Sequence, residues 1–240
     1  KWGIEYLYQP PLTQQLGIFS RQSITEELMN AFVREIHRRY KFAEIFLNYC
    51  NSNPHLKARN NYILALNRPY EIIKNNYSTD LIKNLKRSSR FDLNYRKENN
   101  LALALKLHEE YYRKRTPHVK KGDYQNFEKV CNHLMREEKI LLRGAYDSKN
   151  QLLSIALMML DPRRIYLIES TTTKLGRDMQ ANHFLLDCLI REFAEREMIL
   201  DFVGSNISGI SHFYKNFGST NQPYFFFRMN NLPWPLKLFK

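Results

Sequence analysis

Three short apolar segments joined by compact turns constrain the fold of this 240-residue chain most strongly. They cover residues 139–146, 152–160 and 165–171, and the turns between them read DSKNQ and DPRR. Asp, Ser, Asn and Pro are the residues that tight turns use. The pattern therefore predicts three consecutive antiparallel strands in a meander.

Helices and further strands are predicted on both sides of this meander. Two amphipathic helices begin near Leu101 and Tyr124, and residues 181–197 place apolar side chains on one broad face, as a long helix does. The polar stretch at 171–180 is predicted to be a loop. Further strands are predicted at 90–99, 198–203 and 223–230, and a short helix at 208–217. These elements predict an α/β (α+β) fold with a mixed, mostly antiparallel sheet flanked by helices.

The first half of the chain resembles a shortened copy of the second. Tyr6 and Tyr166 each open a stretch that ends in Leu-Gly, and these residues are 160 apart, whereas Gly17 and Gly176 are 159 apart. In both halves a helix, a strand and a later aromatic-led strand follow. We therefore predict a tandem duplication, with a partial domain and a basic connecting helix at 1–88 and a complete domain at 89–240. Because the chain begins in mid-strand without Met, we expect that a longer natural protein has lost its beginning here.

Charge and cysteine content narrow the range of functions. The 37 Lys and Arg against 24 Asp and Glu give a formal net charge of +13, which favours polyanionic partners such as nucleic acid, a nucleotide cofactor or an anionic membrane surface. The longest apolar run, 152–160, is shorter than the roughly 20 residues of a membrane-spanning helix, so a soluble, cytoplasmic protein is predicted.

The three cysteines form no CxxC pair and are predicted to be buried thiols. No HxxxH or HExxH spacing is present, and no metal is expected.

Two basic clusters, at residues 83–97 and 113–123, stand beside predicted loops. One interpretation is a pair of solvated faces. The other is a groove between the two copies in which a large anionic substrate lies. The candidate substrate-binding residues are Lys86, Arg87, Arg90, Lys120 and Lys121.

The stretch DFVGSNISGISHFYKNFG at 201–218 carries glycines at the spacing of a nucleotide-binding loop. No Lys follows Gly209, so the residue that would reach the phosphates is missing. Gly204 and Gly209 are therefore predicted to serve a strand-to-helix turn. Asp201 stands inside an apolar strand, where an unpaired carboxylate would be costly, and we expect an Arg or backbone partner for it.

The order of elements over residues 90–230 resembles the GNAT (acyl-CoA N-acyltransferase) fold. The tandem arrangement and the basic connecting helix resemble more specifically the FemABX group and its FemAB-like bacterial relatives. The stretches TQQLG, SRFDLNYRK and DFVGSNISGISHFYKNFG carry that resemblance. FemABX proteins transfer an aminoacyl group from tRNA to a peptidoglycan precursor.

The resemblance implies a cofactor loop after the fourth strand of the GNAT fold. In that family, backbone N–H groups of a Q/R-x-x-G-x-G/A segment hold the cofactor pyrophosphate at a helix N-terminus. Here the loop lacks the second glycine, and the FemABX group does not keep the cofactor loop either. The residues on these positions are Thr173, Lys174, Leu175, Gly176, Arg177 and Gln180.

The resemblance also implies catalytic residues. Tyr214 stands where GNAT proteins carry a Tyr that protonates the leaving thiolate, and Lys215 stands on the Lys of the Phe-Lys pair that FemABX proteins use for anionic groups. Glu169, at the end of the fourth strand, is the candidate that takes the proton of the amine. Each of the three also has a plain structural interpretation: a packed ring for Tyr214, and solvent exposure for the two charged side chains.

Together these observations predict an N-acyltransferase. It would move an acyl or aminoacyl group from a CoA thioester or an aminoacyl-tRNA to an amine on a peptidoglycan-type or other cell-envelope precursor, in a bacterial cytoplasm. The expected partners are anionic: CoA, tRNA or a phosphorylated envelope precursor. The alternative is a non-catalytic RNA- or anion-binding module on a degenerate acyltransferase fold, with aromatic side chains stacking on bases.

Overall fold

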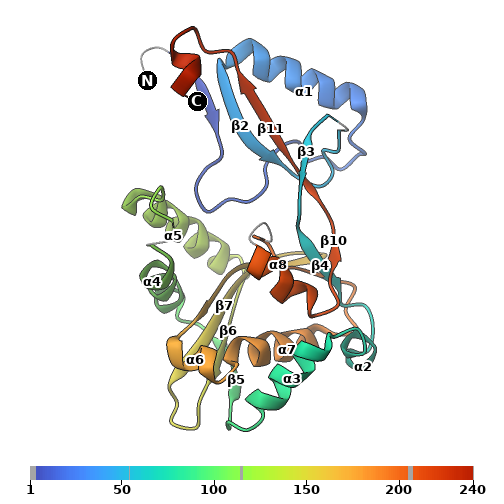
Figure 1. Ribbon diagram of the computed structural model, residues 1–240, viewed down its shortest axis with the longest axis vertical. Coiled ribbons are helices and arrows are strands. Elements are labelled where there is room, and N and C mark those ends of the chain that lie inside the picture. Colours follow the sequence, from blue (N-terminus) through green and yellow to red (C-terminus); the bar gives the residue numbers. More distant parts are fainter. Residues whose placement is uncertain (1–3, 54, 114–115, 205–207, 240) are drawn as a thin grey trace. The chain divides into compact units, whose positions relative to one another are not determined.

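The computed structural model in Figure 1 describes residues 4–239, apart from 54, 114–115 and 205–207. The chain forms two compact units. The first consists of residues 1–61 and 222–240, and the second of residues 62–221. The chain therefore passes from one unit to the other twice, near Asn61 and near Gln222.

The first unit is a four-stranded sheet with one long helix. The strands are ordered β1-β2-β11-β3, and only the β1–β2 pair is parallel. Helix α1 packs Met29 and Ile36 against apolar side chains of β2 and β11. The bounds are β1 Tyr6–Tyr8, α1 Glu26–Arg39, β2 Phe42–Leu47, β3 Lys57–Arg59 and β11 Tyr224–Asn230, followed by a short 3-10 helix at Leu236–Phe239.

The second unit is a seven-stranded sheet, ordered β10-β4-β9-β8-β7-β6-β5. Its centre is the predicted meander, since β6, β7 and β8 pair antiparallel in succession. The strands are β4 Tyr62–Ala65, β5 Asn94–Glu98, β6 Ile140–Tyr146, β7 Leu152–Asp161, β8 Arg164–Thr172, β9 Ile199–Asp201 and β10 Thr220–Asn221. The helices are α2 Tyr70–Lys74, α3 Thr79–Ser88, α4 Leu101–Tyr112, α5 Lys121–Arg136, α6 Lys174–Asp178, α7 Ala181–Phe193 and α8 Ser208–Lys215. The predicted fold class, a mixed and mostly antiparallel sheet flanked by helices, is confirmed.

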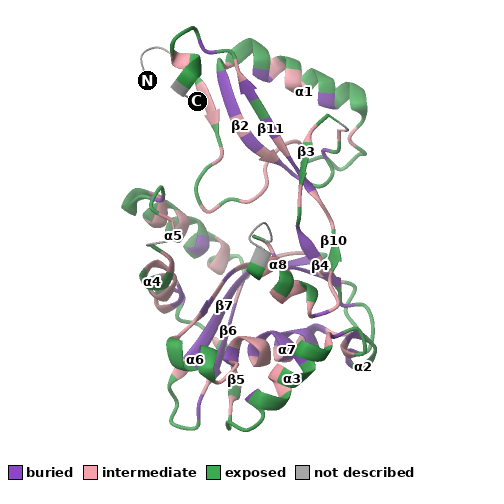
Figure 2. Cartoon of the chain, viewed as in Figure 1, coloured by how far each residue is buried: buried purple, intermediate pink, exposed green. Residues whose placement is uncertain are grey.

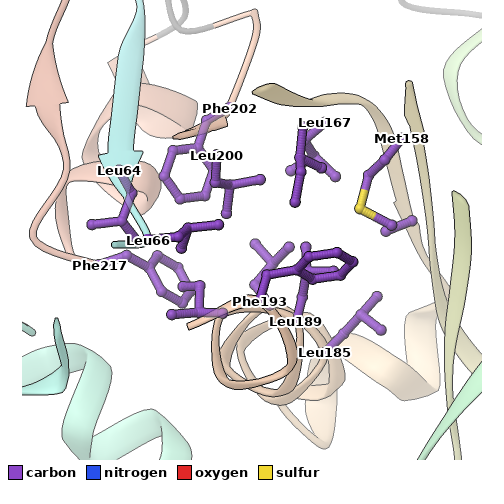
Figure 3. Packing of buried hydrophobic residues seen from close by; sticks show 14 of the residues in the cluster. Leu64, Leu66, Met158, Leu167, Leu185, Leu189, Phe193, Leu200, Phe202 and Phe217 are labelled. Carbon is purple, nitrogen blue, oxygen red and sulfur yellow. The ribbon is translucent and has the colours of Figure 1, made fainter. Parts of the chain in front are cut away.

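Helices cover both faces of this sheet. On one face, the apolar side of α7 lies against the strands, and Leu185, Leu189 and Phe193 point toward Met158 and Leu167 (Figure 3). Helix α3 packs on α7 on that face. On the other face, α4 and α5 pack against β6, β7 and β8 in a separate apolar cluster. The strands between these layers and the inner side of α7 are buried (Figure 2), and each fully buried Leu or Phe there contributes about 1.5–3 kcal/mol.

The strand pairing bears on the predicted duplication. β4, in the first half of the chain, pairs with β9 of the second half. β11, in the second half, pairs with β2 of the first half. In the two parallel pairs, Tyr6 lies opposite Phe42 and Tyr166 lies opposite Asp201. These positions differ by 160 and 159 residues, the same offsets that align the two halves of the sequence. The duplication itself, and the boundary between residues 88 and 89, stay predictions.

Two sequence-based expectations are corrected by the structure. The polar stretch before α7 is not a loop throughout, because β8 extends to Thr172 and Lys174–Asp178 form the short helix α6, capped by the Thr173 side chain. Cys50 is exposed rather than buried, because it lies in the turn after β2, whereas Cys131 is buried and Cys188 partly so.

The parallel strands β8 and β9 pair over only three residues each. Arg164–Tyr166 lie beside Ile199–Asp201, and β9 then ends while β8 continues to Thr172 with only β7 as its partner. A buried ion pair marks this junction, with Arg164 Nη1 donating to Asp201 Oδ2 at 2.6 Å. The expectation that Asp201 has an Arg partner is confirmed. Beyond it the two strands no longer pair, so the far end of β8 has no strand partner on its β9 side among the described residues.

Candidate functional site

Glu169 lies on the stretch of β8 that runs beyond β9. The register between β7 and β8 shifts just before it, so that Leu157 faces Glu169 while Met158 faces Leu167, and the bulge re-aims the following side chain. Only 6% of the Glu169 side chain is exposed. Burial disfavours the carboxylate and raises the pKa of Glu169 to about 8. The structure thus holds a titratable acid whose protonation changes near neutral pH.

His108, on α4, is the neighbour of this acid. Its Nδ1 lies 3.1 Å from Glu169 Oε2, yet neither atom makes a well-aligned hydrogen bond to any described residue. Burial lowers the pKa of His108 to about 4, so its imidazole is neutral at pH 7. The pair is therefore two buried, uncharged groups with unused hydrogen-bonding capacity, an arrangement that is rare outside functional sites.

Tyr112, one helical turn after His108, links this pair to α8. Its ring stacks on the His108 ring at 4.9 Å, and its hydroxyl donates to the carbonyl of Ser170 at 3.1 Å. The pKa of Tyr214 lies above its usual value, mainly because the side chain is buried. Electrostatic interaction with Tyr112 raises that pKa further. The ring of Tyr214 stacks on Phe202 at 4.6 Å.

Two of the three predicted catalytic residues, Glu169 and Tyr214, are linked through His108 and Tyr112, and their use in one site stays a prediction. We name His108, Tyr112, Glu169 and Tyr214 the diverging-strand site, because β8 and the segment after β9 supply its two sides. Lys215 follows Tyr214 but points elsewhere, since its ammonium group lies 5.2 Å from the centre of the Tyr62 ring on β4. The site contains an acid-base group, a phenol and two supporting side chains.

Solved structures of low sequence identity share this architecture. No protein-family profile matches the sequence, and no curated protein matches it either. A crystal structure of FemX is 12% identical with a TM-score of 0.62, over 98% of this chain and 82% of that one. The C-terminal domain of a putative lysylphosphatidylglycerol synthetase from Agrobacterium fabrum is 11% identical with a TM-score of 0.54, over 89% of this chain and 76% of that one. The L-PGS of Bacillus licheniformis is 10% identical with a TM-score of 0.53, over 92% and 78%.

The chain has the GNAT-like fold of the FemABX group. At these identities the likeness shows the fold alone, so the chemistry must be argued from the site. The match with FemX extends over both units, because it includes almost the whole chain.

The segment that follows the fourth strand in this GNAT-like fold is α6. Its N–H groups are largely used internally: Gly176 N donates to Thr173 Oγ1 at 2.9 Å, and Arg177 N donates to the Thr173 carbonyl at 3.0 Å. Arg177 Nη1 donates to the Thr172 carbonyl, Gln180 is in the left-handed region at φ 58°, and Lys174 and Leu175 are exposed. The predicted phosphate-binding role of these residues stays a prediction, and the backbone of Gly176 and Arg177 has little left to offer an anion.

Gly176 has a packing role that the sequence did not reveal. A Cβ at this position would lie 2.2 Å from the carbonyl oxygen of Leu153 on β7. Only glycine allows α6 to approach the strand so closely. The glycine that resembles a cofactor-loop residue is therefore needed to seat the helix.

The predicted substrate-binding residues lie on opposite faces of the GNAT-like sheet. Lys86 and Arg87 belong to α3 and Arg90 follows it, on the face that α7 covers. Lys120 and Lys121 stand at the start of α5, on the face that α4 and α5 cover. The sheet separates the two groups, so these side chains do not line one groove within this unit. Residues 114 and 115 of the second basic cluster lie outside the described residues.

Sequence reasoning missed His108 and Tyr112 as site residues. Their four-residue spacing puts both side chains on one side of α4, which is a usable signal. The signal does not reveal which strand that side of α4 meets. No group of side chains able to hold a metal ion occurs among the described residues, and no helix in that part of the chain has the length and apolar content to cross a bilayer.

Proposed function

We propose that this protein is an N-acyltransferase that moves an acyl or aminoacyl group from a CoA thioester or an aminoacyl-tRNA to an amine. The observation that carries the proposal is Glu169: a buried carboxyl with a pKa of about 8, on the part of β8 that runs beyond its pairing with β9. Amine acylation needs a group that accepts a proton near neutral pH, and Glu169 has that property.

The transfer assigns one role to each member of the diverging-strand site. The amine nitrogen attacks the donor carbonyl and forms the C–N bond while the C–S or C–O bond to the leaving group breaks. The ionised form of Glu169 takes the proton that the amine nitrogen loses. Tyr214 gives its hydroxyl proton to the departing thiolate or alkoxide, since its raised pKa keeps the phenol protonated beforehand.

His108 and Tyr112 are positioning residues in this scheme. His108 is neutral and contacts Glu169, so it keeps the carboxyl in a site without a nearby positive charge. A positive neighbour would lower the pKa of Glu169 and weaken it as a base. Tyr112 holds the His108 ring by stacking and ties α4 to the backbone of Ser170.

Likeness to named transferases supports the proposal. One neighbour is FemX, and another is a putative lysylphosphatidylglycerol synthetase, whose name indicates a lysyl group joined to phosphatidylglycerol. We propose an anionic acceptor here as well, of the phosphorylated cell-envelope type, in agreement with the net charge of +13.

The test is an acyl-transfer assay on the full chain with two donor series. Acyl-CoA thioesters are followed by release of free thiol, and aminoacyl-tRNAs by transfer of labelled amino acid to an amine acceptor. Glu169→Gln should slow transfer by at least about a hundredfold, whereas Glu110→Gln, which alters an exposed carboxylate on the same helix as His108, should leave the rate unchanged. Full activity in Glu169→Gln, or no transfer from any donor in either series, would refute the proposal; binding without transfer would favour the non-catalytic module.

A further inference from the structure

A pocket of about 410 Å³ lies between α3, α7 and α8 in the second unit. Helix α3 contributes Lys83 and Arg87, α7 contributes His183, and α8 contributes His212 and Phe213, with Asn216 just after it. The pocket lies on the side of the sheet that α7 covers, whereas His108 and Glu169 contact each other on the α4 side. It is therefore separate from the diverging-strand site, although Phe213 and Tyr214 are neighbours on α8.

The charge of the pocket favours an anion. Lys83 and Arg87 are both basic side chains, and the carboxylate in the lining, Asp80, is exposed and lies 3.9 Å from the Lys83 ammonium group. Arg87 donates one N–H to Asn84 Oδ1 at 3.3 Å and contacts no carboxylate within the described chain. Most of its N–H donors are thus free for a ligand, and a guanidinium matches the geometry of a phosphate.

Three other side chains of the lining, His183, Phe213 and Asn216, are held in place by contacts. Burial lowers the pKa of His183 to about 4, so this ring is neutral at pH 7, and it lies 3.3 Å from Asn84 Nδ2 and edge-on to Phe213 at 4.9 Å. Asn216 Oδ1 accepts a hydrogen bond from Ser78 at 3.0 Å. A fixed wall with aromatic rings beside two cations suits a phosphate ester that carries a base or sugar.

We propose that this pocket binds the phosphate groups of the acyl donor. Both candidate donors, CoA and aminoacyl-tRNA, carry phosphate esters next to an adenine. The internal hydrogen bonds of α6 explain why the phosphates go to side chains of α3 rather than to the backbone of the segment after β8. The inference rests on the proposed function for the identity of the ligand, but binding can be measured without turnover.

The test is calorimetric titration of the full chain with two probes. One is adenosine 3′,5′-bisphosphate, the nucleotide end of CoA, and the other is an RNA minihelix that ends in CCA. The variant Lys83→Gln/Arg87→Gln should weaken at least one probe about tenfold, and for the RNA it should reduce the salt dependence by roughly one unit of slope per lost contact. The control Lys106→Gln/Lys129→Gln removes the same charge from α4 and α5 and should change affinity less than about twofold.

The probe that responds identifies the donor class. The proposal is overturned if neither probe binds the wild type below about 1 mM, or if both double variants weaken binding equally. Failure of the proposed function can be distinguished from failure of the pocket proposal. Probe binding that depends on Lys83 and Arg87 without any acyl transfer would refute the enzyme and keep the pocket, whereas Glu169-dependent transfer with an unchanged donor KM in Lys83→Gln/Arg87→Gln would refute the pocket alone.

Discussion

His108 Nδ1 and Glu169 Oε2 are buried atoms that lie 3.1 Å apart, and burial holds both groups in their neutral forms at pH 7. The contact joins α4 to the part of β8 that outruns β9. An ion pair at this distance would fix the carboxylate and make it a weak base. The neutral pair instead leaves Glu169 able to gain or lose a proton near pH 8.

This pair makes stability depend on pH with a definite sign. The folded-state pKa of Glu169, about 8, lies above the unfolded value of 4.5, so the folded state holds the extra proton and stability falls as pH rises toward 8. His108 has the opposite effect, but only between pH 4 and 6.5. From pH 6.5 to 9 the wild type should therefore lose about 2 kcal/mol of unfolding free energy that Glu169→Gln retains. Urea titrations at the two pH values measure this; equal losses in wild type and variant would show that Glu169 is not held protonated.

Substitutions of Tyr214 and of Lys215 should change different kinetic constants. Tyr214→Phe keeps the ring that stacks on Phe202 but removes the proton donor, so kcat should fall about 10²–10⁴-fold with little change in thermal stability. Lys215→Ala should raise KM for an anionic substrate more than it lowers kcat, because its ammonium group lies over Tyr62, away from the stacked rings. Tyr111→Phe on α4 is the matched control. Wild-type rates in both Tyr214→Phe and Lys215→Ala would refute these site assignments.

The buried pair of Arg164 and Asp201 should be essential for folding rather than for chemistry. Arg164→Met leaves the Asp201 carboxylate 1% exposed and without its cationic partner, which should cost about 3–5 kcal/mol of unfolding free energy. Arg163→Met, in the exposed turn before β8, should cost less than about 0.5 kcal/mol. Chemical denaturation measures the free energy of unfolding of the two variants. Similar values would mean that the Arg164–Asp201 pair is not needed for folding.

Gly176 should be intolerant of a side chain for a steric reason. Alanine there would place Cβ 2.2 Å from the Leu153 carbonyl oxygen, so Gly176→Ala should destabilise the protein by about 1–3 kcal/mol. Gly122 on α5 has no atom within 4 Å of such a Cβ, and Gly122→Ala should be neutral or stabilise by about 0.5–1 kcal/mol. If both substitutions behave alike in thermal denaturation, the packing account of α6 is wrong.

Much of the architecture could be predicted because it depends on local signals. The turns after Tyr146 and Asp161 and the apolar face around Leu185 predict the meander and α7 without reference to the rest of the chain. The exchange of β4 and β11 between the two sheets could not be predicted. It depends on which strand edge each segment meets, and both segments pair antiparallel with their partners.

The site could be predicted only in part, for the same reason. Glu169 and Tyr214 stand at positions where a family resemblance marks them, but the contact with His108 arises from α4 crossing β8, a long-range packing event. The predicted groove between the basic clusters could not be checked from sequence for a similar reason. Lys86 and Lys120 both stand in charged stretches of the sequence, yet the sheet lies between their helices, and no charge pattern reveals on which face a helix will pack.

The most direct test of the account is the pH dependence of kcat/KM for amine acylation in wild type and Glu169→Gln. At pH 7 roughly one Glu169 in ten is ionised, so the wild-type rate should rise with pH and level off above about 8. Glu169→Gln should be slower by at least about a hundredfold at every pH and should lack that inflection. A variant that keeps the wild-type rate and the same inflection near pH 8 would contradict the assignment of Glu169 as the group that takes the amine proton.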